Sequence, residues 1–420
     1  MPFRDSLAFH RDFRRLWIGD AASQIGATTS LFMLPLLAAQ TLDATPAQVG
    51  LVSTALTASF LLLGLPAGVW VDRARRRRVL IISDIGRTLA LASLVPAAAF
   101  GVLTLPQLYA VALVYGALTV FFDVAYQSYL PHLVGTDRLA EGNAKLASTQ
   151  SIAQMSGPTV GGLAVQALST SYAVVANGLC FAWSAVWIAL IRTREPRPPA
   201  VPDPHLGREA VEGLRFVFGN RPLRAIAAST GTFNLFRMAS QPMMIVLLSA
   251  QLGLSAGKVG LFFTIGAAGG VAGALCARRI AMSAGQGRTI WMSIALTGPF
   301  GMLVPLAQDD WRFWLAAAGE FAVAFGGMVY DVAQISYRQA LCPERLLGRM
   351  NATMRFLVWG TMPLGALLGG TLASLIGIRA IIWLAALGMA LAFLPVFLSP
   401  LRTKRGPPLK KRPRRRVISE

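Results

Sequence analysis

Twelve apolar stretches, each long enough to cross a bilayer as a helix, constrain the fold of this chain more than any other feature. A transmembrane helix needs about 20 mainly apolar residues. Stretches of that kind cover residues 16–40, 47–71, 79–102, 105–128, 145–167, 172–192, 223–249, 257–281, 288–307, 312–336, 350–374 and 378–399. The first stretch is too long for the apolar part of a cleaved signal peptide, so we count it as a span. The pattern predicts an all-α integral membrane protein with twelve transmembrane helices.

Composition and charge agree with a membrane protein. The chain is 55% hydrophobic and only 14% charged, whereas a soluble domain has about 25% charged residues. The net charge of +20 is spread over alternate loops and both ends of the chain, which argues against nucleic acid as a partner. Because basic loops stay in the cytoplasm, we expect a multi-pass protein of the plasma or inner membrane, surrounded by lipids, with both termini cytoplasmic.

The second half of the chain repeats short motifs of the first half. FFDVAYQSYL, which contains Asp123, matches VYDVAQISYR, which contains Asp331, at an offset of 208 positions, and two glycine pairs match at the same offset. Six helices bring the chain back to the side on which it started, so the two halves enter the membrane from the same side. The repeat therefore predicts two parallel six-helix bundles related by an axis along the membrane normal, which can tilt about a central site.

This repeat divides the chain into four predicted segments. They are an N-terminal bundle (1–195), a cytoplasmic linker (196–222), a C-terminal bundle (223–400) and a basic cytoplasmic tail (401–420). Within the linker, Val211, Leu214 and Phe218 recur at helical spacing, which predicts a short helix on the inner membrane surface.

The loop between the second and third spans carries the most specific motif. It reads GVWVDRARRRRVL and begins at Gly68. With the twelve spans and the repeat, it resembles the major facilitator superfamily over about residues 10–400, although Arg75 stands where a second glycine is usual. The resemblance implies that this loop holds the two bundles together on the cytoplasmic side when the central cavity opens outward. The matching residues are Gly68, Asp72, Arg73, Arg76 and Arg77; the alternative is an ordinary basic cytoplasmic loop.

Several charges close to the cytoplasmic helix ends are assigned to the same latch. They are Asp84, Arg87, Asp123, Asp331, Arg349 and Arg355. We expect the two repeated aspartates to pair with loop arginines such as Arg349 or Arg355, as structural or gating elements rather than as the substrate site.

A glycine–proline motif lies in the fifth span. SGPTVGG supplies Gly157, Pro158, Gly161 and Gly162 and resembles the motif typical of the family's drug/proton antiporters. Small residues also allow ordinary close packing of helices, which is the alternative interpretation. The chain as a whole is most similar to the macrolide and siderophore exporter branch. No arginine occurs within 105–130, so a coupling scheme that depends on an arginine in the fourth span does not transfer.

Three ionisable residues lie deeper in the spans, where charge is costly and is a functional candidate by default. They are Asp20, Arg237 and Glu320, and Asn234 lies one turn before Arg237. At a rise of about 1.5 Å per residue, Arg237 is about 20 Å from the inner face and Glu320 is about 12 Å from the outer face. Their depths nearly coincide in a core about 30 Å thick.

The resemblance implies that these two spans line a central cavity, so we expect Arg237 and Glu320 to pair there. The functional hypothesis is that Glu320 releases a proton to the cytoplasm and regains one outside, and so controls Arg237. A static pair that joins the two helices is the alternative. Asp20 is the reserve candidate for the proton site.

The motifs of other function classes are missing from the sequence. The three cysteines and three histidines show no metal-ligand spacing, and neither a phosphate-binding loop nor a dinucleotide fingerprint occurs. We therefore predict a transporter rather than an enzyme, without cofactor, metal or nucleotide, functional as a monomer.

The predicted activity is export of hydrophobic drug-like molecules or secondary metabolites by proton antiport, with alternating access. Sodium remains an alternative coupling ion. The alternative functions are a specific siderophore or metabolite exporter or importer, and a non-transporting membrane sensor.

Overall fold

The computed structural model describes residues 6–135, 138–193, 195, 206–343 and 346–403, and these residues form helices and no strand. Ten helical stretches among them are long and apolar enough to cross a membrane. The two other predicted spans are also helical. Residues 145–167 belong to α6 (Leu139–Ala189), and residues 223–249 cover most of α8 (Arg221–Val246) and reach into the π-helical turn (Leu247–Gln251) that follows it.

The first half of the chain forms one bundle. Its remaining helices are α1 (Arg11–Thr41), α2 (Pro46–Arg73), α3 (Arg76–Ala92), α4 (Leu94–Ala99) and α5 (Leu105–Val134). The capping box at Thr45 and Gln48 and a proline at the first position fix the start of α2.

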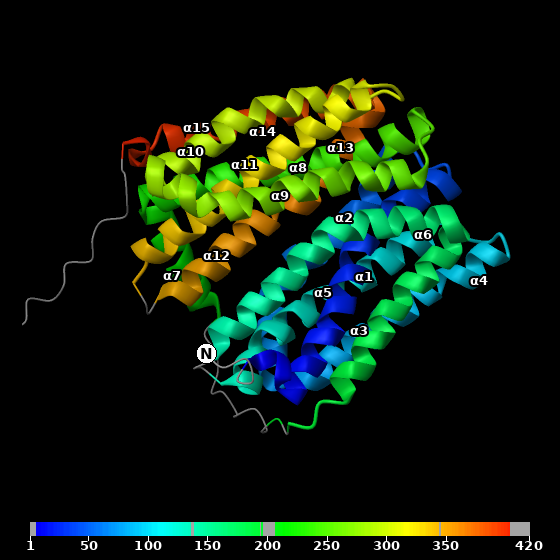
Figure 1. Cartoon of the computed structure of the whole chain (residues 1–420), viewed down its shortest axis with the longest axis horizontal. Coiled ribbons are helices and arrows are strands. Elements are labelled where there is room, and N and C mark those ends of the chain that lie inside the picture. Colours follow the sequence, from blue (N-terminus) through cyan, green and yellow to red (C-terminus); the bar gives the residue numbers. More distant parts are fainter. Residues whose placement is uncertain (1–5, 136–137, 194, 196–205, 344–345, 404–420) are drawn as a thin grey trace, which may run out of the picture.

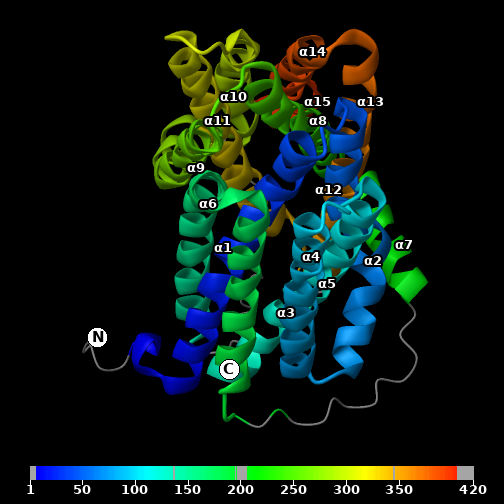
Figure 2. The ribbon, with the colours of Figure 1, turned by 90° about the vertical axis from the view of Figure 1, so that its right-hand side faces the viewer.

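Helix α6 is a single helical segment of 51 residues that nevertheless supplies two spans. From its start toward its middle, α1 contacts residues of increasing number on the first arm of α6, from Thr149 to Gly157. Over the same part of α1, the contacted residues of the second arm decrease in number, from Ser184 to Asn177. The two arms are therefore antiparallel and reverse between residues 157 and 177. Figure 2 shows both arms beside α1. The fifth and sixth predicted spans are thus both present.

The second half of the chain forms the other bundle. After α8 its helices are α9 (Ala256–Ala284), α10 (Gln286–Thr297) with a 3-10 extension (Gly298–Leu306), α11 (Arg312–Leu341), α12 (Leu347–Trp359), α13 (Thr361–Ile376), α14 (Ile378–Leu391) and α15 (Leu394–Phe397). The eleventh span is divided between α12 and α13, and the twelfth between α14 and α15.

Close contacts join the two bundles at one end, along α2 against α13 and along α6 against α9. A Cβ atom on Gly370 would lie 2.9 Å from the Cα atom of Gly50, and one on Gly162 would clash with the carbonyl of Ala256. Glycine is therefore required for this approach. We call this set of contacts the glycine seal.

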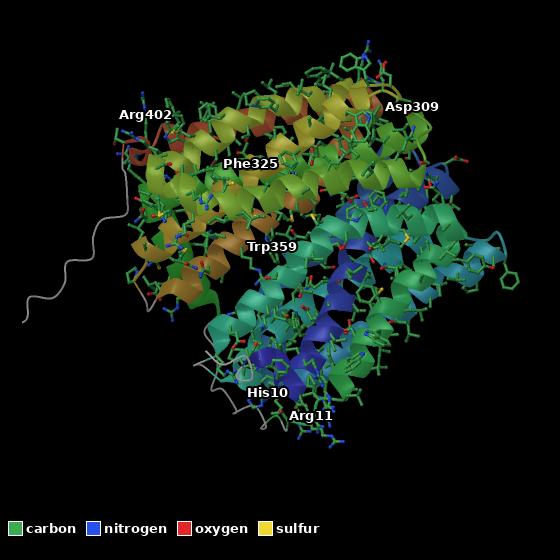
Figure 3. All side chains as sticks on the ribbon, in the orientation of Figure 1. His10, Arg11, Asp309, Phe325, Trp359 and Arg402 are labelled. Carbon is green, nitrogen blue, oxygen red and sulfur yellow. The ribbon has the colours of Figure 1, made fainter. Side chains whose placement is uncertain are left out.

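The bundles diverge away from the glycine seal. They meet toward the end that holds Asp309 and separate toward the end that holds Arg11 and Arg402 (Figures 1 and 3). The diverging end carries the basic loops, and we call it the arginine-rich end. Midway along α2, Phe60 touches Trp359 of the other bundle, with ring centroids 4.9 Å apart.

The linker contains the helix that its apolar spacing predicts. Helix α7 (Leu206–Gly219) packs on α12, where a Cβ atom on Gly213 would clash with the Thr353 hydroxyl. Glu212 also forms an ion pair with Arg349. The rest of the linker (196–205) and the tail from residue 404 lie outside the described residues.

Candidate functional site

A cavity of about 450 Å³ lies between the two bundles. The N-terminal bundle contributes Thr28 and Phe32 from α1 and Gln154 and Pro158 from α6. The C-terminal bundle contributes residues from α8, α9 and α11. They are Phe233, Asn234, Arg237, Gln241, Phe263, Ala267, Gly270, Val271, Ala274, Glu320, Ala324, Gly327, Met328 and Asp331. The cavity walls therefore combine aromatic rings with a few polar and charged groups, as binding sites for small molecules do.

Arg237 on α8 and Glu320 on α11 meet in this cavity. Their closest atoms, Nη1 and Oε1, are 3.7 Å apart, and their side chains are 33% and 16% exposed. The separation exceeds hydrogen-bond length, so the two groups form a loose ion pair that either one can leave. Gly266 on α9 makes room for Glu320, because a Cβ atom there would lie 2.7 Å from its Cγ atom.

Asn234 and Asp331 also line this cavity. Gln334 donates a hydrogen bond to the Asp331 carboxylate at 3.3 Å. The sequence predicts that Asp331 pairs with a loop arginine and lies apart from the substrate site. The structure instead places Asp331 on the cavity wall and pairs Arg349 with Glu212.

Asp84 and Arg87 lie inside the N-terminal bundle, which differs from their predicted place in the latch. Both side chains are buried, and Arg87 donates to Asp84 at 2.5 Å and to Ser23 at 3.2 Å. The rings of Phe122 and Phe181 cover the guanidinium, with centroids 4.3 and 4.4 Å away. Such an ion pair, enclosed by aromatic rings, joins α1, α3, α5 and α6. It is a packing element of the bundle.

Asp20 is buried in the same bundle, with 1% of its surface exposed. Gln24 donates a hydrogen bond to its carboxylate at 3.2 Å. Asp84 and Asp123 are close enough to repel it electrostatically. Asp20 therefore belongs to a buried acidic group in the N-terminal bundle and does not line the central cavity.

Asp123 lies within electrostatic range of Arg87 and Arg355. Arg355 reaches across the bundle interface, where its guanidinium lies 4.1 Å from the Trp359 ring centroid and donates to Gln127 at 3.2 Å. Arg355 and Trp359 line a second cavity of about 290 Å³, with Phe60 and Val120 of the N-terminal bundle on its other side. Arg355 is therefore a member of the predicted latch that touches both bundles in this structure.

Arg76 and Arg77 of the loop motif contact the end of the N-terminal bundle. The backbone N–H groups of Arg76 and Arg77 donate to Glu195 at 2.9 and 3.1 Å. The Arg77 side chain donates to the carbonyls of Ile188 and Ala189 at the end of α6. Arg73 is exposed, and the side chain of Asp72 lies outside the described residues, as does any contact it makes.

The glycine–proline motif lies on two interfaces at once. A Cβ atom on Gly157 would clash with Thr28, and one on Gly161 would lie 3.1 Å from Thr29, so these two glycines bring α6 against α1. Gly162 and the Pro158 carbonyl face α9 of the other bundle. The motif thus belongs both to bundle packing and to the glycine seal.

Sequence reasoning missed several residues of the cavity and of the seal. Phe263, Gln154 and Gly266 gave no signal because ordinary apolar spans contain the same residue types. Thr159 and Thr264, whose hydroxyls hydrogen-bond between α6 and α9, were not identified either. These residues differ from their neighbours only in that they point toward the cavity or the glycine seal. Helix packing determines that direction.

Comparison with known proteins gives a consistent result. The family model described as Major Facilitator Superfamily matches residues 16–360 and 226–420. The multidrug efflux pump Tap of Mycolicibacterium fortuitum is 29% identical over 380 residues, which cover 84% of this chain and 87% of that protein. The enterobactin exporter EntS of Shigella dysenteriae serotype 1 is 27% identical over 319 residues, 72% of this chain and 71% of that protein.

Solved structures share the fold at lower identity. A bacterial homologue of the iron transporter ferroportin, in an inward-facing state, superposes with a TM-score of 0.74 at 14% identity, covering 92% of this chain and 98% of that one. The nucleoside transporter NupG superposes with a TM-score of 0.72 at 13% identity, over 92% and 99% of the two chains.

Proposed function

The chain belongs to the Major Facilitator Superfamily, and from that membership we propose that it exports hydrophobic drug-like molecules or secondary metabolites by proton antiport. Membership makes the protein a multi-pass membrane transporter of small molecules and not an enzyme. Both relatives named above are exporters by name, which supports the outward direction of transport.

The Arg237–Glu320 pair carries the proposal of proton coupling. Both residues belong to the C-terminal bundle, and their ion pair lines the cavity between the two bundles. The bundles contact each other at the glycine seal. A carboxylate in such a position exchanges protons with whichever side the cavity faces, and its charge determines whether Arg237 is neutralised. Glu320 is ionised when the cavity faces the cytoplasm and is protonated when it faces outside.

The bundles diverge toward the arginine-rich end, which we assign to the cytoplasm on the positive-inside rule. Transport then requires the glycine seal to open and the arginine-rich end to close. We assign that closure to the loop motif, in which Asp72 accepts hydrogen bonds from the start of a helix in the other bundle. Arg355 already contacts both bundles and would remain in the closed interface.

One experiment tests export and coupling together. The protein is expressed in a host that lacks its own efflux pumps, and cellular accumulation of a panel of hydrophobic compounds is measured with and without a protonophore. We expect expression to lower accumulation of at least one compound and the protonophore to restore it. Accumulation that stays unchanged across the panel would contradict export, and lowered accumulation that resists the protonophore would contradict coupling to protons.

Export of a specific metabolite is the second candidate, because one relative is named for enterobactin. A competition assay against the best panel compound distinguishes the two. A broad set of unrelated competitors supports multidrug export, and inhibition by a narrow chemical series supports a specific substrate.

A further inference from the structure

We propose that the second cavity, between α2, α5 and α12, binds an anionic phospholipid of the cytoplasmic leaflet. The phosphate lies at Arg355, and part of one acyl chain lies in the cavity. The inference concerns a site other than the one that carries the proposed export, and it depends on neither the substrate nor the coupling ion. It starts from the lining of this cavity of about 290 Å³, to which the N-terminal bundle contributes Phe60, Gly64, Val120 and Val124.

The second cavity and the central cavity are separate sites. Among the described residues, none lines both. Helices α1, α6, α8, α9 and α11 form the central cavity, whereas α2, α5 and α12 form the second one. The second cavity therefore lies on the side of the molecule where α2 meets α13, and two of its lining residues, Ala352 and Phe356, are exposed. A membrane lipid can reach it from that side without passing the substrate site.

The polar groups of this cavity lie toward the arginine-rich end, and its aromatic groups lie deeper. On α12, Asn351 and Arg355 come four and eight residues after the first residue of the helix, about 6 and 12 Å from its start. Phe356 and Trp359 follow them, and Trp359 touches Phe60 midway along α2. A matching ligand has its polar group toward the cytoplasm and its apolar part toward the middle of the membrane. Phospholipids of the cytoplasmic leaflet have this orientation.

Arg355 supplies the positive charge for the phosphate. A guanidinium has five N–H donors, and Arg355 donates from Nη1 to the Gln127 side chain at 3.2 Å. Trp359 covers one face of the guanidinium, with 4.1 Å from Cζ to the ring centroid, and leaves its donor edges free. Asp123 attracts Arg355, but in the part of the chain that the structure describes no carboxylate lies within 4 Å of it. Arg355 can therefore bind a phosphate by two parallel hydrogen bonds.

The rest of the wall favours a lipid over a soluble phosphate. The side chains of Phe60, Val120, Val124 and Phe356 are apolar, so a small hydrated anion gains no contact from them. Gly64 leaves room for a chain, because a Cβ atom there would have no neighbour within 4 Å. A lipid chain comes from a bilayer that is as apolar as the cavity. The preference among lipids therefore comes from the headgroup, and a basic pocket between helices on the cytoplasmic side selects an anionic one.

A lipid in this cavity also influences the transport cycle. It contacts Arg355 and Phe356 of one bundle and Phe60 and Val120 of the other. Closure of the arginine-rich end brings α5 and α12 together, so the lipid must leave before the bundles can close there. A ligand that binds one arrangement better than the other shifts the equilibrium toward it. Anionic lipid therefore favours the diverged arrangement.

The test measures the lipid retained by the purified full-length protein in detergent, by native mass spectrometry. Dioleoylphosphatidylglycerol, which is anionic, and dioleoylphosphatidylcholine, which is zwitterionic and has the same chains, are added at equal concentrations. We expect the protein to retain phosphatidylglycerol in preference by about fivefold, and Arg355→Gln to remove this preference. Arg279→Gln, the same change at an exposed position near the end of α9 and outside the cavity, should keep it.

Two further variants separate the charge from the shape of the site. Arg355→Lys keeps the charge and should retain the preference, whereas Ala352→Phe puts a ring into the cavity and should lower retention of both lipids. Thermal unfolding of each variant is recorded, so that loss of the lipid is not confused with loss of folding. sn-Glycero-3-phosphoglycerol, the headgroup without chains, should not compete at the same concentration.

Three results would overturn the proposal. They are equal retention of the two lipids by the native protein, an undiminished preference in a folded Arg355→Gln variant, and full competition by the soluble headgroup. Neither a substrate nor a proton gradient enters the measurement. Failure here therefore leaves the proposed export function in place, and failure of export leaves this inference in place.

Discussion

Replacing Glu320 with glutamine is the perturbation that most directly tests the proposed coupling. Glutamine has nearly the same shape as glutamate but carries no charge and does not titrate near neutral pH. At an effective dielectric constant of about 20, opposite unit charges at the observed separation attract by about 4 kcal/mol. The two side chains are 33% and 16% exposed, so water screens this attraction. We therefore expect the substitution to remove about 1–2 kcal/mol of favourable electrostatic energy from the cavity.

That magnitude predicts a split between two measurements. A change of about 1–2 kcal/mol corresponds to a factor of about 5–30, so ligand binding in Glu320→Gln weakens within this range and the protein still folds. Uphill transport driven by a pH gradient disappears altogether, because a side chain that does not titrate cannot carry the proton.

The assay uses proteoliposomes loaded and diluted to impose a pH gradient, and compares uphill transport with exchange of labelled for unlabelled substrate at equal pH. We expect the variant to keep exchange and to lose the response to the gradient. Asp309→Asn, made and reconstituted in parallel, should behave like the native protein in both. Uphill transport by Glu320→Gln at the native rate would remove Glu320 from the coupling mechanism.

Two further predictions concern the helix contacts. Arg87→Ala leaves Asp84 buried without its partner, and we expect about 3–5 kcal/mol of destabilisation. This loss is measured as a lower unfolding midpoint in detergent. A midpoint within error of the native one would contradict this role for the pair. Gly370→Ala places a methyl group 2.8 Å from the Pro46 carbonyl and should open the glycine seal, measured as faster labelling of a cysteine at position 54 by an impermeant maleimide from the outer side. Gly64→Ala, where a Cβ atom has no neighbour within 4 Å, is its control, and equal labelling of the two variants would refute the seal.

Much of the fold could be predicted from the sequence because the physics of insertion is local. Length and hydropathy decide whether a stretch spans the bilayer, so most of the spans, including 16–40 and 105–128, coincide with long helices. The sixth span was also expected, although α6 continues through the turn without a break in helical geometry. Helix depth likewise placed Arg237 and Glu320 at one level, and the structure brings them within 3.7 Å.

The site could be predicted only in part because the sequence does not give the direction in which a side chain points. Asp123 and Asp331 occupy equivalent positions in the repeat, yet only Asp331 lines the central cavity. Asp84 and Arg87 have the spacing of a surface pair on a helix, but the rings of Phe122 and Phe181 enclose Arg87 inside the bundle. These outcomes depend on the rotation of each helix, which packing against distant parts of the chain determines.

A reversible cross-link of the glycine seal is the most direct test of alternating access, the central claim. Thr159 on α6 and Thr264 on α9 hydrogen-bond across the two bundles, so cysteines at both positions, in a chain whose Cys180, Cys276 and Cys342 are replaced, can be joined by oxidation. We expect oxidation to stop export and reduction to restore it, while either single-cysteine variant is unaffected. Export at the native rate by the fully cross-linked protein would contradict the claim that the bundles must separate at this end.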